Sequence, residues 1–172
     1  MMESLVMTVI GDDRPGLVEL LARTVADCDG NWLESRMSHL AGKFAGILRV
    51  DIPADRVAPL LETLRGLESG GLRVASEASA AAAEDVPAVR LELMGADHVG
   101  IVRDIAALLA RRQINVEEFT TDCVPAPMSG QMLFQATALL RLPPGVTEAE
   151  LRADLEDVAQ DLMVDITLSD EA

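Results

Sequence analysis

The chain has 172 residues, of which 49% are hydrophobic, and it carries a formal net charge of −15 at pH 7. This length allows one ordinary domain or two small ones. A charge of this sign would repel a phosphate backbone, so we expect no direct binding of DNA or RNA. Aromatic residues make up only 2% of the chain, so few side chains could stack on bases or sugars.

Other features of the sequence are typical of a cytoplasmic protein. No run approaches the roughly 18 apolar residues that are needed to span a bilayer. The first four residues lack the basic and apolar regions of a signal peptide. The two cysteines, Cys28 and Cys123, do not form a C-x-x-C pair, and we predict that each is a buried structural thiol.

One turn sequence occurs twice in the chain. Gly11–Val18 reads Gly-Asp-Asp-Arg-Pro-Gly-Leu-Val, and Gly95–Val102 reads Gly-Ala-Asp-His-Val-Gly-Ile-Val. The two copies share the pattern Gly-x-Asp-x-x-Gly-[Leu/Ile]-Val at a step of 84 residues (95 − 11 = 84). Asn31 and Asn115 are related by the same step, which indicates a duplicated unit.

Each copy has the character of a turn between a strand and a helix. Pro15 is predicted to be the first helical residue, where its missing N–H has no consequence. Asp13 and Asp97 are predicted to accept backbone N–H groups at the helix starts. Gly16 and Gly100 permit a tight turn or close approach by a ligand. Such a helix start can hold an amino-acid carboxylate, although the same residues also suit purely structural caps.

The first unit is predicted to have the order β-α-β-β-α-β. Its first strand is a short apolar run rich in β-branched residues, which suggests burial on both faces. The next two strands are separated by the turn Ala41–Gly42 and form a hairpin. The expected elements are Leu5–Ile10, Gly16–Cys28, Asn31–Leu40, Phe44–Ile52, Val57–Leu67 and Leu72–Ala75.

The second unit is predicted to repeat this order. Phe134 matches Phe44 at a step of 90 (134 − 44 = 90), so six residues were gained in the hairpin, near Cys123–Met128. Thr147 and Glu150 have the spacing of a capping box at the start of the last helix. The expected elements are a strand at Val89–Met94, a helix at Ile101–Arg112, a hairpin from Asn115 to Pro143, a helix at Thr147–Leu162 and a strand at Val164–Leu168.

The predicted fold class is α+β, with two tandem ferredoxin-like βαββαβ domains. Each would be an antiparallel four-stranded sheet with two helices on one face. We place the first domain at residues 1–79, a linker at 80–87 and the second domain at 88–172. Ser76–Pro87 is small and polar, which is typical of a linker, although its Ala run could equally be a helical turn.

The turn Gly11–Val18, followed by Asn31, resembles the opening of an ACT domain, the small-molecule regulatory module of amino-acid metabolism. Two such modules, over residues 4–79 and 88–169 with no enzyme domain, are similar to the glycine cleavage system transcriptional repressor family. The resemblance implies regulation without catalysis. The implied function is repression of glycine cleavage genes through a LysR-type activator protein, with glycine modulating that association.

The resemblance also implies ligand sites where the strand-to-helix turn of one module meets the second strand of another, in a homodimer. Backbone N–H groups near Gly16 or Gly100 would bind the ligand carboxylate, and an Asp or Asn would accept from its ammonium group. His98–Val99 in place of Arg14–Pro15 distinguishes the second copy. No metal, cofactor or catalytic residue is implied. The residues carried over by position are Asp12, Asp13, Gly16, Leu17 and Asn31, with Asp97, Gly100, Ile101 and Asn115.

An enzyme is not expected from the residues themselves. His39 and His98 are the only histidines, and neither lies in a metal-ligand array or near a Gly-x-Ser-x-Gly motif. Two alternatives remain open. The chain could be a detached ACT regulatory subunit that binds an amino acid and controls a metabolic enzyme. It could also be a dimeric interaction protein that binds no ligand, with structural turns.

Overall fold

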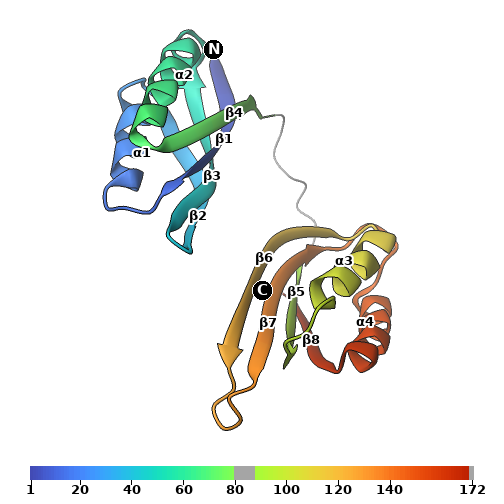
Figure 1. Cartoon of the computed structure of the whole chain (residues 1–172). Coiled ribbons are helices and arrows are strands. Elements are labelled where there is room, and N and C mark those ends of the chain that lie inside the picture. The colour runs from blue at the N-terminus through green and yellow to red at the C-terminus, as the bar shows by residue number, and fades with distance from the viewer. Residues whose placement is uncertain (80–87, 171–172) are drawn as a thin grey trace. The chain divides into compact units, whose positions relative to one another are not determined.

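The computed structural model describes residues 1–79 and 88–170 (Figure 1). The chain divides into two compact units, Met1–Ala83 and Glu84–Ala172, and each has a hydrophobic core of its own. The predicted linker, residues 80–87, lies outside the described residues, so the proposed domain boundaries stay a prediction.

The first unit follows the predicted order, with one short 3₁₀ turn before and one after its second helix. Its strands pair antiparallel in the order β2-β3-β1-β4. The elements are β1 (Met2–Asp12), α1 (Leu17–Ala26), β2 (Asn31–Leu40), β3 (Lys43–Pro53), η1 (Ala54–Arg56), α2 (Val57–Gly66), η2 (Leu67–Gly70) and β4 (Leu72–Ala78).

The second unit repeats this architecture. Its strands pair antiparallel in the equivalent order β6-β7-β5-β8. The elements are β5 (Ala88–Ala96), α3 (Ile101–Arg111), β6 (Asn115–Pro125), β7 (Met132–Arg141), α4 (Glu148–Leu162) and β8 (Val164–Asp170). The α+β prediction of two tandem ferredoxin-like units is therefore confirmed.

The helices of each unit cover only one face of its sheet (Figure 1). Along β1, Leu5, Met7 and Val9 face the helices and are at most 4% exposed, whereas Ile10 on the opposite face is 42% exposed. Successive strand residues point to opposite faces, so a sheet with helices on one side buries only every second residue. The prediction that this strand is buried on both faces was wrong.

The hairpins show how the two copies diverge. His39 pairs with Phe44 across the first hairpin, and Cys123 pairs with Phe134 across the second, which confirms the six-residue insertion. The inserted residues 126–131 connect β6 to β7. Both hairpins also have a register shift after their second residue, between Trp32 and Glu34 in the first and between Val116 and Glu118 in the second.

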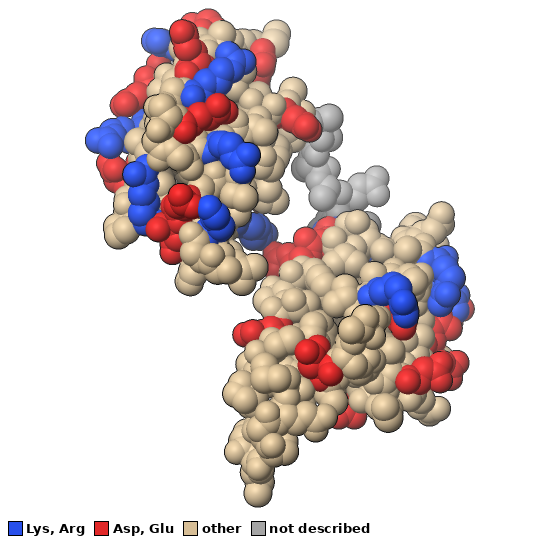
Figure 2. Space-filling view, in the orientation of Figure 1, with Lys and Arg blue, Asp and Glu red and all other residues tan. Residues whose placement is uncertain are grey.

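Charged side chains are absent from a continuous stretch of the second hairpin. Residues 123–140 contain no Asp, Glu, Lys or Arg, although these make up 25% of the chain, and the tip of the hairpin lacks charged groups in Figure 2. Met128 at this tip is fully exposed. The thiol of Cys123 is exposed, so the prediction that it is buried was wrong, whereas Cys28 is buried as predicted.

The predicted capping box at the start of α4 is present. The Thr147 hydroxyl oxygen accepts the N–H of Glu150 at 3.3 Å, and the Glu150 carboxylate accepts the N–H of Thr147 at 2.9 Å. These bonds satisfy backbone donors that have no partner within the helix. The backbone N–H and the hydroxyl of Thr147 both donate to the Glu150 carboxylate, which lowers the pKa of Glu150 below its usual value.

Candidate functional site

The duplicated turns occupy the same place in each unit, between the first strand and the first helix. Each turn is fixed to the hairpin of its own sheet by one backbone hydrogen bond. The N–H of Asp13 donates to the carbonyl of Gly42 at 3.0 Å, and the N–H of Asp97 donates to the carbonyl of Met132 at 3.0 Å. The backbone amide of the motif aspartate, rather than its carboxylate, therefore anchors the turn.

The helix starts differ from the prediction. Gly16 and Gly100 are the N-cap residues, with positive φ angles of 91° and 106°, and neither helix start has a side-chain cap. The predictions that Pro15 is the first helical residue and that Asp13 and Asp97 cap the helices were wrong. The turn needs a left-handed residue immediately before the helix, which glycine adopts without a Cβ penalty.

A second contact ties each turn to the far end of the unit's second helical segment. The Arg14 guanidinium donates to the carbonyl of Gly70 at 2.9 Å. Nε2 of His98, which follows Arg14 by the same 84-residue step, lies 2.9 Å from the carbonyl oxygen of Leu162, and Nδ1 lies 3.2 Å from that of Val99. Hydrogen bonding to these two carbonyls raises the pKa of His98 above its usual value. An arginine in the first unit and a histidine in the second thus make equivalent contacts with a backbone carbonyl.

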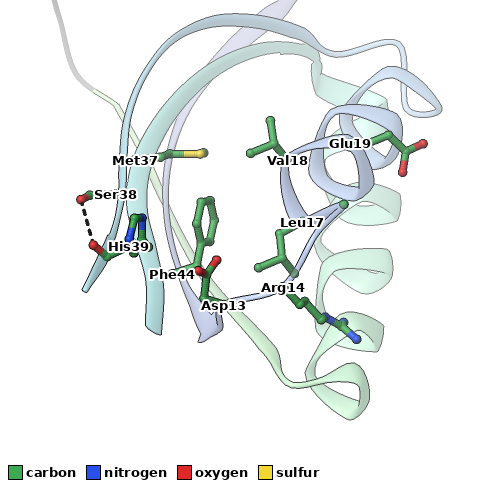
Figure 3. Close-up of a pocket in the computed structure, with 10 residues that line it drawn as sticks. Asp13, Arg14, Leu17, Val18, Glu19, Met37, Ser38, His39 and Phe44 are labelled. Carbon is green, nitrogen blue, oxygen red and sulfur yellow. Dashed lines mark hydrogen bonds between the residues drawn. The ribbon is translucent and has the colours of Figure 1, made fainter. Parts of the chain in front are cut away.

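The first turn lines an open pocket of about 480 Å³ beside β2 and β3 (Figure 3). In this view Met37 and Val18 point toward each other across the pocket, and Asp13 lies beside the Phe44 ring. Arg14 and Glu19 point away from it. The pocket therefore combines apolar walls with one carboxylate near the start of α1. Its lining residues are Asp13, Arg14, Gly16, Leu17, Val18, Glu19, Met37, Ser38, His39 and Phe44.

The structure brings together only some of the residues predicted for the first site. Asp13, Gly16 and Leu17 line the pocket, but Asp12 and Asn31 do not. Asp12 forms an ion pair with Lys43, which lowers the pKa of the Asp12 carboxyl. Asn31 lies at the opposite end of β2, paired with Asp51. The ligand-binding role of these residues stays a prediction.

Sequence reasoning missed the pocket residues on the hairpin. Met37 and His39 pair with Gly46 and Phe44 of β3, on the face of the sheet that carries the helices. The sequence signal that could have identified these residues is the alternation of side chains between the two faces of the sheet along β2. The register shift after Trp32 reverses that alternation, which hides the set of residues that faces the pocket.

The second unit has an apolar slot of about 10 Å³ between its sheet and α3. The slot is not the equivalent of the first pocket, because only Ile101, Val102 and Phe134 correspond to residues that line that pocket. Of the four residues predicted for the second site, Ile101 lines this slot, whereas Asp97, Gly100 and Asn115 do not. The slot is lined by Leu91, Leu93, Ile101, Val102, Ile105, Phe119, Phe134, Ala136 and Ala138.

Neither a metal-binding cluster nor a membrane-spanning helix is found among the described residues. Within residues 1–79 and 88–170, no group of three or more His, Cys, Asp or Glu side chains is arranged to hold a metal ion. In the same part of the chain, no helix is long and apolar enough to cross a membrane.

Comparison with known proteins shows which families the chain resembles. The ACT domain family model matches residues 3–72, and the second unit repeats the fold of the first. The chain is therefore similar to ACT domains over its first unit, and its second unit has the same strand order. In particular, it resembles the glycine cleavage system transcriptional repressor of Escherichia coli strain K12, with 29% identity over 139 residues that cover 78% of this chain and 73% of that protein.

Two solved structures have the same architecture over nearly the whole chain. An unknown protein from Galdieria sulphuraria is 28% identical, with a TM-score of 0.86 over 100% of both chains. A candidate glycine cleavage system transcriptional repressor is 18% identical, with a TM-score of 0.72 over 99% of this chain and 98% of the other. The second likeness supports the fold alone.

Proposed function

We propose that the chain is a non-enzymatic, amino-acid-responsive regulator. It represses transcription of glycine cleavage genes by acting on a LysR-type activator protein, and it works as a homodimer in the cytoplasm without a metal or cofactor. The similarity to a repressor of the glycine cleavage system supports a regulatory role. The net charge of −15 supports action through a protein partner rather than through DNA.

The observation that carries the proposal is the open pocket beside the start of α1. The N–H groups of the first helical turn have no acceptor within the helix, and they lie at the positive end of its dipole. An amino-acid carboxylate can bind there. The Asp13 carboxylate, which lines the same pocket, can accept hydrogen bonds from the ligand ammonium group. The pocket thus offers complementary groups to both charges of an amino acid.

Calorimetric titration of the full chain with glycine, serine, alanine, leucine and methionine tests this proposal. We expect saturable binding of at least one of these, with glycine the first candidate. Asp13→Asn removes the charge that faces the ammonium group, and a charge-assisted hydrogen bond is worth about 1.5–3 kcal/mol. Binding should therefore weaken about 10-fold or more in this variant.

The neighbouring aspartate provides a matched control. Asp12 does not line the pocket and is paired with Lys43, so Asp12→Asn should bind the same amino acid within about two-fold of the natural chain. Equal loss in both variants would indicate a general charge effect. The absence of binding for every amino acid would favour an interaction protein whose turns are structural.

The partner is tested separately by affinity purification of the chain from its own cells, with and without added glycine. Recovery of a LysR-type activator whose amount changes with glycine supports the repressor function. Recovery of a metabolic enzyme instead would replace it with the function of a detached regulatory subunit.

A further inference from the structure

We infer that the end of the second hairpin docks a partner protein, and that this partner presents an apolar groove with Lys or Arg side chains at its rim. The hairpin end, residues 123–133, comprises the last residues of β6, the loop and the first residues of β7. The inference rests on the proposed function only in that a partner protein exists. It does not require that the first pocket binds an amino acid.

The hairpin end is exposed and carries no charge. It contains no Asp, Glu, Lys or Arg (Figure 2), whereas these residues make up 25% of the chain. Met128 is 100% exposed and Met132 is 42% exposed. Depletion of charge and enrichment of Met are typical of the centre of protein–protein interfaces, and the flexible Met side chain adapts to the shape of a partner. The composition of the hairpin end therefore favours a role in protein binding.

The fold of the second unit does not use the hairpin end. β5 pairs with β7 from Leu133 onward, so residues 125–132 extend past the end of β5 (Figure 1). The buried core of this unit reaches β7 at Phe134, and none of the described residues 123–133 belongs to it. The first unit forms the same sheet with a hairpin turn of only two residues. Apolar surface that is exposed and not needed for the core is typical of an interaction site.

The hairpin end is held in shape by backbone hydrogen bonds. The N–H of Ala126 donates to the carbonyl of Gln131 at 2.8 Å, and the N–H of Gly130 donates to the carbonyl of Ala126 at 3.2 Å. The bond from the Asp97 amide to the Met132 carbonyl fixes the base of the loop to the turn after β5. A preformed loop loses less conformational entropy on binding than a flexible one. The exposed side chains of the loop are therefore presented on a fixed backbone.

The charges around the hairpin end determine which partner it fits. Desolvation and the nearby carboxylates of Asp97 and Asp122 raise the pKa of the Cys123 thiol, so two negative charges lie near the base of the hairpin end. Residues 88–170 contain 14 Asp and Glu and six Arg, a net charge of −8 (6 − 14 = −8). These charges repel a second copy of the unit and an anionic membrane, and they attract a groove with a basic rim.

Photo-crosslinking of the full chain in its own cells tests the inference first. An amino acid that carries a benzophenone replaces Met128 in one variant and Leu40 in its control, because Leu40 lies beside the turn of the first hairpin and is 80% exposed. We expect position 128 to cross-link to one protein, at an apolar groove flanked by Lys or Arg, and position 40 not to do so. Cross-links from position 128 to a second copy, to lipid, to an acidic surface or to nothing would each overturn the inference.

The cross-linked protein is then purified, and its affinity for the full chain is measured by calorimetry at low and at high salt. Met128→Glu places a charge in the apolar contact and should weaken binding more than about 10-fold. Leu40→Glu adds the same charge outside the contact, where salt screens it, and should leave the affinity within about two-fold. Affinity for the natural chain should fall as the salt concentration rises, because salt screens the basic rim from the acidic unit.

A shorter loop provides an independent test. Replacement of residues 125–132 by Ala-Gly, the turn of the first hairpin, should abolish partner binding and leave the amino-acid titrations unchanged. Equal weakening by Met128→Glu and Leu40→Glu, or full affinity with the shorter loop, would overturn the inference. Circular dichroism checks that each variant is folded. If no amino acid binds but Met128→Glu alone weakens partner binding, the ligand proposed for the first pocket is refuted and the docking surface is not.

Discussion

The turn after β1 and the turn after β5 are held by the same contacts but present different surfaces. In both turns a backbone amide donates to the hairpin, and a glycine in the left-handed conformation precedes the helix. In both, a side chain also contacts a backbone carbonyl that lies two residues before the last strand of the unit, the carbonyl of Gly70 or of Leu162. The residues around those contacts differ: Asp104 in the first turn of α3 corresponds to Leu20 of α1, and Arg103 corresponds to Glu19. The comparison teaches that a turn can keep its backbone hydrogen bonds while the side chains around it change.

The largest expected effect tests whether the two units are independent. Leu21 and Ile105 are equivalent core residues, 0% and 5% exposed, in separate cores. Truncation of such a residue to Ala costs about 2–5 kcal/mol. In scanning calorimetry we expect two transitions, of which Leu21→Ala lowers only one and Ile105→Ala only the other. A parallel shift of both transitions would show that the units unfold as one block.

The next effect tests whether the two turns share one backbone requirement. The φ angles of Gly16 and Gly100 are 91° and 106°, and a left-handed conformation costs a residue with a Cβ about 1–2 kcal/mol. Gly16→Ala and Gly100→Ala should each lower the free energy of unfolding of their own unit by about this amount in urea titrations.

Gly66 provides a control for this pair, because its replacement by Ala should change the free energy of unfolding in the opposite direction. It ends α2 at φ −59°, with no neighbour within 4 Å of a Cβ among the described residues. Gly66→Ala should stabilise the first unit by about 0.4–1 kcal/mol. If Gly16→Ala behaved like this control, the left-handed turn would not be required.

A smaller effect distinguishes the second helices of the two units. Thr147→Ala removes both bonds of its hydroxyl at the start of α4 and should destabilise the second unit by about 1 kcal/mol. Arg56 precedes α2 without a side-chain cap, and it forms an exposed ion pair with Asp29 at 3.4 Å. Arg56→Ala should therefore change urea unfolding of the first unit by less than about 0.5 kcal/mol. Equal costs would mean that the capping box adds no stability.

The smallest expected effect is a pH dependence confined to the second unit. An imidazolium can donate to both carbonyls at the turn, whereas neutral His98 can donate to only one. Because folding raises the pKa of His98, its contribution to stability is complete below about pH 6.5 and is lost as the pH rises through the folded-state pKa. The equivalent contact in the first unit is made by a guanidinium group, and guanidinium groups do not change charge in this pH range, so that contact has no such dependence.

Thermal unfolding between pH 6 and pH 8 measures this difference. The second unit should lose stability relative to the first as the pH rises, and His98→Arg, which copies the first unit, should remove that loss. A loss that is the same in His98→Arg would assign the pH dependence to other groups.

The sequence was sufficient to predict the fold because hydrophobic periodicity and the duplication agreed with each other. The 84- and 90-residue steps matched every strand of the second unit to its equivalent in the first. Thr147 and Glu150 marked the start of the last helix because their side chains can form a capping box. Which face of a strand is buried could not be read from Leu5–Ile10, since apolar residues occupy both faces there.

The site was harder to predict because it depends on the three-dimensional packing of a strand. Asp13, Gly16 and Leu17 were found because they belong to the repeated motif. Met37 and His39 were not found, because the register shift after Trp32 changes which residues of β2 face the helices, and no residue pattern marks that shift. The register shift after Val116 changes the alternation of β6 in the same way.

The backbone bonds from Asp13 to Gly42 and from Asp97 to Met132 have a consequence for loop engineering. Six residues, 126–131, separate Pro125 from Met132, whereas their counterparts Ala41 and Gly42 are adjacent. The second unit thus accommodates a longer loop without releasing its turn. Each doubling of loop length adds only about 0.6 kcal/mol of closure entropy. The peptide bond between Ala41 and Gly42 is therefore the place to graft an epitope or a fluorescent label into the first unit.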